Sequence, residues 1–221
     1  MNGHARSNAS GPIIGIVLIF GLGYAVLRCH IAGPVPWKDF LFLVLNKGIA
    51  LSAFILLTCS FSLGSLSKLG FKVPEGWLNA RKAMDMTGFL LLLVHALMSF
   101  LRFTPAVYGE LFGPDGTLTL RAGLSILGAI LAFVMLWAYN LSFQTSLRED
   151  RTYIRFITAR KFMLFALLLG ASHLFFMGYN SWLAPSDWPW GLPPVGLVAF
   201  VVFTVEFIAN LLGREPGGVD P

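Results

Sequence analysis

The chain has 221 residues, of which 56% are hydrophobic and only 12% are charged, and its mean hydropathy is +0.73. Soluble domains usually carry about 25% charged residues, so this composition excludes an ordinary soluble domain and indicates a membrane protein. The net charge of +5 does not indicate a nucleic-acid partner, because the sequence shows no basic groove interleaved with exposed aromatic residues.

Apolar residues fall in blocks of about 20, the length that a helix needs to cross ~30 Å of hydrocarbon at ~1.5 Å per residue. We predict membrane-spanning helices at Ile13–Ala32, Phe40–Leu63, Ala83–Phe103, Gly123–Thr145, Phe162–Leu183 and Val195–Leu212. The predicted loops are Ser67–Arg81, Thr104–Arg121, Ser146–Lys161 and Ala184–Pro194. The sequence thus predicts an all-α polytopic membrane protein, a six-transmembrane-helix bundle with a single domain over 1–221 and short tails at 1–12 and 213–221.

Basic residues predict the orientation of this bundle, because Lys and Arg are retained in short cytoplasmic loops. If the N-terminus is inside, the inner segments hold Arg6, Lys68, Lys72, Arg81, Lys82, Arg148, Arg151, Arg155, Arg160, Lys161 and Arg214. The outer segments hold only Arg28, Lys38, Arg102 and Arg121, while Trp182, Trp188 and Trp190 fit an outer aromatic belt. We therefore expect a multi-pass protein of the inner (cytoplasmic) membrane with both termini cytoplasmic. The first block shows no small-x-small cleavage site before Arg28 and is predicted to be a retained helix.

Motifs of self-contained enzymes are absent from the sequence. It has no phosphate-binding glycine motif, no GxSxG elbow and no HExxH pair. Cys29 and Cys59 are predicted near opposite ends of the first two helices, too far apart for a disulfide, and neither has metal-ligand spacing. Any electrons or substrate are therefore expected to come from another molecule.

Polar residues inside the predicted spans are costly in lipid and usually face a partner or a cofactor. They are Asn46, Lys47, Asp85, His95, Asn140, His173, Asn180, Glu206 and Asn210. His95 follows Lys82 by 13 residues and His173 follows Lys161 by 12 residues, so the two imidazoles rise ~20 Å and ~18 Å from matching basic anchors. Two imidazoles at the same depth on two helices are suited to axial ligation of one haem iron.

Neighbouring residues allow two interpretations. Gly88 and Gly170 share the histidine faces and would let a flat macrocycle approach the backbone, but they are equally typical of close helix packing. Arg102 and Asn180 lie seven residues outward of the histidines, where they could meet haem propionates, although Arg102 is also typical of an interfacial anchor. Each histidine, in turn, could be a helix–helix hydrogen bonder without a cofactor. His30, at a helix end, and His4, in the N-terminal tail, are not predicted as ligands.

These residues resemble a known family. Asn46–Ser52, Arg81–Gly88 running on to His95, and Arg160–Lys161 leading to His173 are similar to the ferric reductase-like transmembrane domain. Within this family, the likeness is strongest to the haem-binding membrane subunits of bacterial periplasmic methionine-sulfoxide reductase systems. It covers roughly Leu45 to Trp182, which gives a haem-binding core of about 45–183.

The resemblance implies one bis-histidine haem b, with His95 and His173 as the iron ligands. Two-haem relatives carry a second histidine on each of the same helices, whereas this chain has Arg81 and Gly109 at the corresponding positions of the third helix. On the fifth helix it has Arg160 and Ser186. The methionine-sulfoxide reductase subunits also carry a histidine where this chain has Arg160, and that is a departure from their pattern.

The sequence therefore predicts a haem-binding electron-transfer protein, an electron-transfer subunit of an oxidoreductase system. A cytoplasmic flavin reductase or a membrane quinol would supply electrons, and a redox partner protein on the outer side would accept them. Asp85 and Glu206 are candidates to take protons from a quinol, while Asp85 could instead pair with Arg81 or Lys82. Two alternatives remain: a cofactor-free structural or assembly subunit of a membrane complex, and a small transporter that uses Lys47, Asp85 and Glu206.

Overall fold

The computed structural model describes residues 9–144 and 150–213, and within them it holds helices and no strand. Six helical segments are long and apolar enough to cross a membrane: Ser10–Ile31, Trp37–Lys68, Glu75–Leu101, Leu120–Leu141, Arg160–Trp182 and Pro189–Leu212. The predicted all-α six-helix bundle is confirmed. Most of each predicted tail lies outside the described residues, including His4 and Arg6 in the first tail and Arg214 in the second. Thr145, Ser146 and Arg148 lie outside them too.

The main helices are α1 (Ser10–Ala25), α2 (Asn46–Lys68), α3 (Glu75–Leu101), α4 (Leu120–Leu141), α5 (Arg151–Ile157), α6 (Arg160–Trp182) and α7 (Val195–Leu212). The first span continues from α1 as a π-helix, η1 (Val26–Ile31), and the second begins with a short 3₁₀ turn and a π-helix, η3 (Phe40–Leu45), before α2. Both π-helices flank the hairpin between the first two spans.

Several predicted boundaries differ from those of the structure, two of them widely. The third helix begins at Glu75 rather than Ala83, because its first two turns are too polar to be read from hydropathy; Pro74 precedes it and Glu75 places an acid in its first turn. The predicted loop Ser146–Lys161 contains the short helix α5, which begins after Asp150, whose carboxylate accepts a hydrogen bond from the Tyr153 backbone N–H at 2.9 Å. The first helix begins at Ser10, within the predicted tail.

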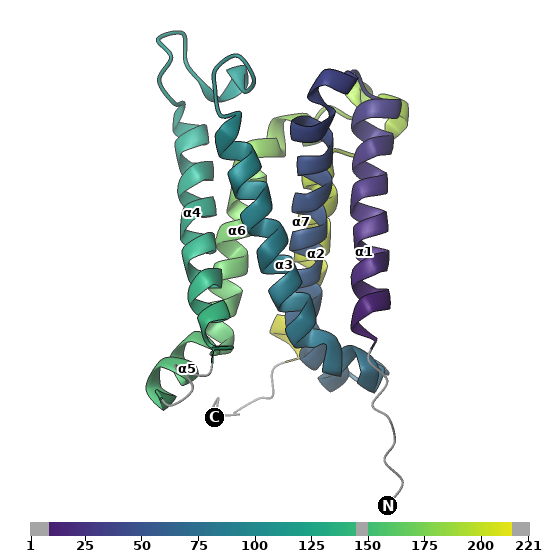
Figure 1. Ribbon diagram of the computed structural model, residues 1–221, viewed down its shortest axis with the longest axis vertical. Coiled ribbons are helices and arrows are strands. Elements are labelled where there is room, and N and C mark those ends of the chain that lie inside the picture. The colour runs from purple at the N-terminus through teal and green to yellow at the C-terminus, as the bar shows by residue number, and fades with distance from the viewer. Residues whose placement is uncertain (1–8, 145–149, 214–221) are drawn as a thin grey trace, which may run out of the picture.

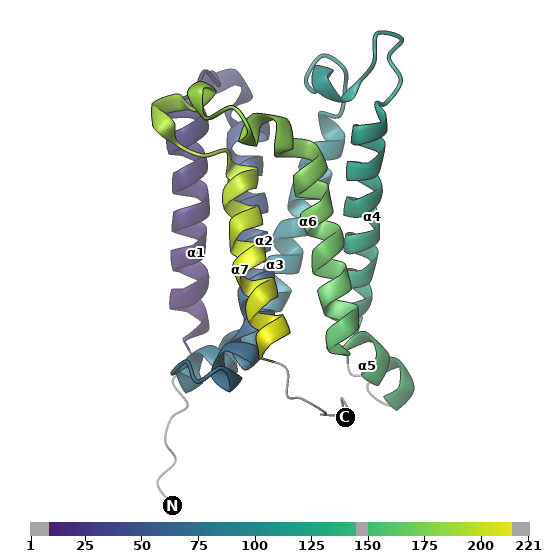
Figure 2. The same ribbon diagram turned by 180° about the vertical axis from the view of Figure 1, so that it is seen from behind.

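Helix α2 is the centre of the bundle. It packs against α1, α3 and α7, while α4 pairs with α6, and α6 also contacts α7. Figures 1 and 2 show the result from opposite sides: α1 and α4 lie at opposite edges, and α3 runs obliquely between α2 and the α4–α6 pair. The ends of α2 and α7 and the starts of α3 and α6 lie at one end of the bundle, which we call the basic end because it carries Lys68, Arg81 and Arg160.

Small residues bring α1 and α2 into close contact. A β-carbon at Gly48 would lie 2.9 Å from the Leu22 Cα and 3.1 Å from the Gly21 carbonyl oxygen. Ser52, which is fully buried, donates to the Gly48 carbonyl at 2.9 Å. Association of membrane helices depends on such close backbone approach, because lipid is as apolar as the side chains it would release.

Polar side chains join α2 to α7. The Asn210 amide nitrogen donates to the Ser62 hydroxyl at 2.8 Å, and the Ser65 hydroxyl donates to the Asn210 amide oxygen at 2.7 Å. Cys59 donates to the Glu206 carboxyl group at 2.9 Å. We call these side chains the α2–α7 polar seam.

The loops at the opposite end hold the helices in place. The His30 Nδ1 lies 2.7 Å from the Val35 carbonyl oxygen, and its ring packs on Trp37 with a centroid distance of 4.1 Å. Tyr24 and Arg28 both donate to the Pro193 carbonyl, which ties α1 to the segment before α7. His30 therefore has a local structural role in the hairpin.

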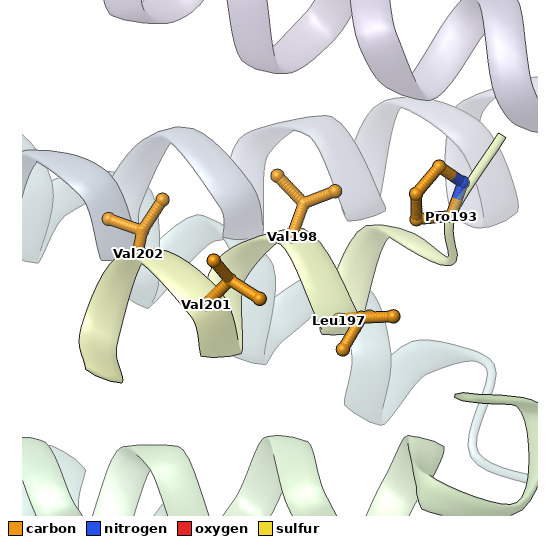
Figure 3. Close-up of a pocket in the computed structure, with 5 residues that line it drawn as sticks. All are labelled: Pro193, Leu197, Val198, Val201 and Val202. Atoms are coloured by element: carbon orange, nitrogen blue, oxygen red, sulfur yellow. The ribbon is translucent and has the colours of Figure 1, made fainter. Parts of the chain in front are cut away.

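An apolar depression of about 280 Å³ lies along α7 (Figure 3). Its lining side chains are Pro193, Leu197, Val198, Val201 and Val202. None of them can donate a hydrogen bond or bind a metal, and Val201 is 52% exposed. The depression belongs to the apolar surface of the bundle rather than to a site for chemistry.

The close approach at Gly48 leads to a stability prediction. Gly48→Ala should lower the free energy of unfolding by ~1–3 kcal/mol, because the added methyl group meets the α1 backbone. Gly15→Ala is the matched control, since a β-carbon at Gly15 has nothing within 4 Å, and it should leave stability unchanged or raise it slightly. Unfolding of the detergent-solubilised protein measures both. Equal effects of the two variants would contradict the packing described for α1 and α2.

Candidate functional site

His95 and His173 occupy the same region of the bundle. His95 lies on α3 and His173 on α6, and both helices start at the basic end. Both residues are only partly exposed. The two helices thus run in the same direction from one end of the bundle, as the basic anchors before each histidine predict.

Asn46 of α2 holds the His95 ring. The His95 Nδ1 lies 2.8 Å from the Asn46 amide oxygen, and the Asn46 amide nitrogen donates to the Ser99 hydroxyl at 3.0 Å. An amide oxygen only accepts, so Nδ1 carries the proton and the lone pair of the neutral ring lies on Nε2. Asn46 is only 3% exposed, so its orientation is fixed inside the bundle.

Ser125 of α4 holds the His173 ring in a similar way. The His173 Nδ1 lies 2.9 Å from the Ser125 hydroxyl oxygen and 3.2 Å from the Ser125 carbonyl oxygen. The Ser125 hydroxyl itself donates to the His173 carbonyl at 3.1 Å, so its oxygen is left to accept from Nδ1. Gly128 allows this approach, because a β-carbon there would lie 2.6 Å from the Ser172 hydroxyl oxygen.

These contacts leave two Nε2 atoms as metal-ligand candidates. Among the described residues, neither Nε2 has a hydrogen-bond partner. A hydrogen bond at Nδ1 is the usual outer-shell contact that orients a metal-bound imidazole. The part of the chain that the structure describes has no group of three or more His, Cys, Asp or Glu side chains suited to a bare metal ion. Haem iron needs only axial ligands from the protein, so the two histidines fit haem better than a bare ion.

The spacing of helices agrees with this donor set. α3 and α6, which carry the histidines, are not among the closely packed helix pairs, whereas α2 with α3 and α4 with α6 are the most extensively packed. Each histidine helix is thus fixed by a different neighbour. The pair is held by its surroundings rather than by direct contact between α3 and α6.

Gly88 and Gly170 make room for α2. A β-carbon at Gly88 would lie 2.9 Å from Leu57 Cγ and 3.2 Å from the Ala53 carbonyl oxygen. One at Gly170 would lie 3.3 Å from the ring of Phe54. Gly88 shares a face of α3 with His95, as its spacing predicts, but α2 lies across that face. These contacts support the helix-packing interpretation of both glycines.

Arg102 and Asn180 occupy different surroundings. An Arg102 Nη2 bonds to the Asp39 carboxylate at 3.2 Å, and its guanidinium lies over the Phe42 ring at 5.4 Å, while Nε is buried with no partner. This supports the interfacial-anchor interpretation of Arg102. In the adjacent loop, burial raises the pKa of Tyr108 above its ordinary value, against the opposing effect of Arg102. Asn180 is exposed, and its role toward a propionate stays a prediction.

The two acids within the spans, Asp85 and Glu206, lie apart from the histidines. Asp85 is ten residues before His95 on α3, or ~15 Å nearer the basic end. It accepts a hydrogen bond from the Tyr139 hydroxyl at 3.1 Å, whereas the nearby Arg81 donates to the Ser60 carbonyl. Glu206 belongs to the α2–α7 polar seam, and its Oε2 is buried without a partner. The exposed Lys47 contacts neither acid among the described interactions.

Sequence reasoning missed Ser125 and left Asn46 without a role. Serine is common in membrane helices, and nothing in the α4 sequence shows which of its residues turns toward α6. Asn46 is recognisable in the sequence as a polar residue within a span, but its contacts with His95 and Ser99 depend on how α2 and α3 pack.

No protein-family model matches this chain, and no curated protein matches it either. The support for a function therefore comes from these side chains.

The hydrogen bond between Asn46 and Ser99 can be tested directly. A double-mutant cycle of Asn46→Ala with Ser99→Ala should give a coupling of about 0.6 kcal/mol, with an upper limit of about 1.7 kcal/mol, as for other hydrogen bonds between membrane helices. As the control, Asn46→Ala should be additive with Asn210→Ala, because Asn210 bonds to Ser62, ~24 Å further along α2. Unfolding free energies in detergent provide the measurement. A zero coupling for the first pair would contradict the hydrogen bond between Asn46 and Ser99.

Proposed function

We propose that this protein is a membrane b-type cytochrome in which His95 and His173 hold one haem through their Nε2 atoms. The observation that carries the proposal is the pair of buried partners, Asn46 and Ser125, which engage both Nδ1 atoms and leave both Nε2 atoms free. The resemblance to the ferric reductase-like transmembrane domain points to the same two residues.

Each residue of the site has a defined task in this proposal. Asn46 and Ser125 fix the tautomer and ring orientation of the two ligands, so that little order must be imposed when iron binds. The surrounding helices exclude water from the imidazoles. A bound haem supplies a one-electron redox couple whose potential depends on ligands, burial and neighbouring charge.

Electrons would pass between partners on the two sides of the membrane. The described residues form no nucleotide-binding domain, so the donor is a separate flavin reductase or a quinol in the bilayer. The acceptor is a redox protein at the end opposite the basic end, because the histidines lie closer to that end. In a quinol reaction Asp85 or Glu206 would accept protons, since both are carboxyl groups within the spans and toward the basic end.

The ligand assignment leads to a direct test of haem binding. His95→Ala and His173→Ala should each abolish haem retention, whereas His30→Ala should retain it, because His30 bonds within its own hairpin. Pyridine haemochrome absorbance against protein mass, on protein purified after haem supplementation, should give one haem per chain for the wild type and the His30 variant.

Three results would count against the proposal. A normal b-type spectrum in either of the first two variants would remove that residue as a ligand. A colourless wild-type protein would favour the cofactor-free assembly subunit, in which both histidines serve only as helix–helix hydrogen bonders. A ratio near two would require a second site.

We further propose that the basic end faces the cytoplasm of a cell with an inner membrane. Lys68, Lys72, Arg81, Lys82, Arg151, Arg155, Arg160 and Lys161 gather there, against Arg28, Lys38, Arg102 and Arg121 at the other end. In a Cys29→Ala/Cys59→Ala background, an impermeant thiol reagent should label Thr117→Cys and Asp187→Cys in intact spheroplasts and Ser67→Cys only after lysis. All three positions are exposed in the fold. The opposite pattern would invert the orientation.

A further inference from the structure

A cavity of about 210 Å³ lies at the basic end, between the ends of α2 and α7 and the starts of α3 and α6. Its polar lining residues are Ser65, Lys68, Arg81, Thr158, Arg160 and Asn210. It is separate from the histidine site, because Arg160 precedes His173 by 13 residues on α6, or ~20 Å. Nothing in the proposed haem function uses it.

The charged residues that line this cavity, in the part of the chain that the structure describes, are all basic. Arg81 of α3 and Arg160 of α6 both reach it, and the exposed Lys68 of α2 is a further lining residue. Two guanidinium groups that share a partly buried space repel one another unless an anion lies between them. The cavity is therefore complementary to a negatively charged group.

Arg160 shows which atoms would meet that group. Its Nε and Nη2 are buried and have no hydrogen-bond partner. These two nitrogens form one edge of the guanidinium, the edge that binds two oxygens of a phosphate or carboxylate side by side. A buried guanidinium edge without an acceptor is costly, so an absent ligand accounts for it better than an empty space does.

The other polar groups of the lining already have partners. The Ser65 hydroxyl donates to Asn210, and the Thr158 hydroxyl donates to the Ile154 carbonyl at 2.6 Å. Arg81 donates through Nε to the Ser60 carbonyl, which holds its guanidinium beside the cavity. Arg160 is also the first residue of α6, whose N-terminus has no side-chain cap and favours an anion. The Arg160 nitrogens without a partner and the uncapped N-terminus of α6 thus lie at the same place.

We propose that this cavity binds a phosphate group, with the Arg160 guanidinium edge as its main donor and Arg81 completing the positive surroundings. The ligand chemistry is shared by two sources, the headgroup of an acidic phospholipid and free inorganic phosphate. The cavity lies at the ends of the membrane spans, the depth at which lipid phosphates and basic side chains meet.

The test compares Arg160→Gln with Lys161→Gln, since both remove one positive charge from the same helical turn but Lys161 is exposed and outside the cavity. Melting temperatures are measured in uncharged detergent with inorganic phosphate against chloride at equal ionic strength. A parallel series adds phosphatidylglycerol against a diacylglycerol with the same acyl chains. Arg160→Gln should weaken the apparent affinity by about tenfold to a hundredfold, while Lys161→Gln should respond as the wild type does.

The two ligand series identify the source. Stabilisation by phosphatidylglycerol alone assigns a lipid headgroup, stabilisation by phosphate alone assigns the free ion, and stabilisation by both assigns a site open to either. No response of the wild type, or an equal loss in both variants, would overturn the proposal. Arg160→Gln should fold, because it relieves repulsion. If it does not, Arg160→Lys keeps the charge, lacks the two-nitrogen edge, and should still bind more weakly than Lys161→Gln.

Discussion

The bundle depends on one constraint: a polar side chain inside hydrocarbon must find a partner on another helix. The contacts that orient both histidines are such pairs: Asn46 of α2 meets His95 of α3, and Ser125 of α4 meets His173 of α6. Nearer the basic end, Tyr139 of α4 meets Asp85 of α3 in the same way. Since apolar packing alone discriminates poorly between helix faces in lipid, these pairs determine how each helix is rotated.

The same pairs connect fold and chemistry. The partner that fixes a helix also fixes the tautomer of the histidine on it, so no separate device is needed to prepare the two rings. Glycines at the helix contacts support these pairs indirectly. Gly128 allows α4 to approach α6 at Ser172, and Gly88 allows α3 to approach α2 at Leu57, which brings both histidine partners into range.

Hydropathy predicted the number of spans and the common direction of α3 and α6, because both depend on where apolar blocks and basic residues fall along the chain. It could not predict the start of α3 at Glu75 or the helix α5, since these lie beyond the hydrocarbon and leave no apolar block. The seven-residue spacing placed Gly88 on the face of His95, but it could not show that α2 lies across that face. The contact of Ser125 with His173 could not be predicted for the same reason. The rotation of a helix about its axis is decided by its tertiary partners and not by its own composition.

The α2–α7 polar seam has a consequence for biogenesis. Ser62 and Ser65 enter the membrane with the second span, but Asn210 is synthesised last, with the sixth. Until α7 arrives, the Ser65 hydroxyl and the Cys59 thiol lack the acceptors that they have in the finished bundle, whereas Ser62 already donates to the Thr58 carbonyl of its own helix at 2.9 Å. The last span therefore completes the polar contacts of the central helix, so the second span reaches its final surroundings only after the sixth has been synthesised.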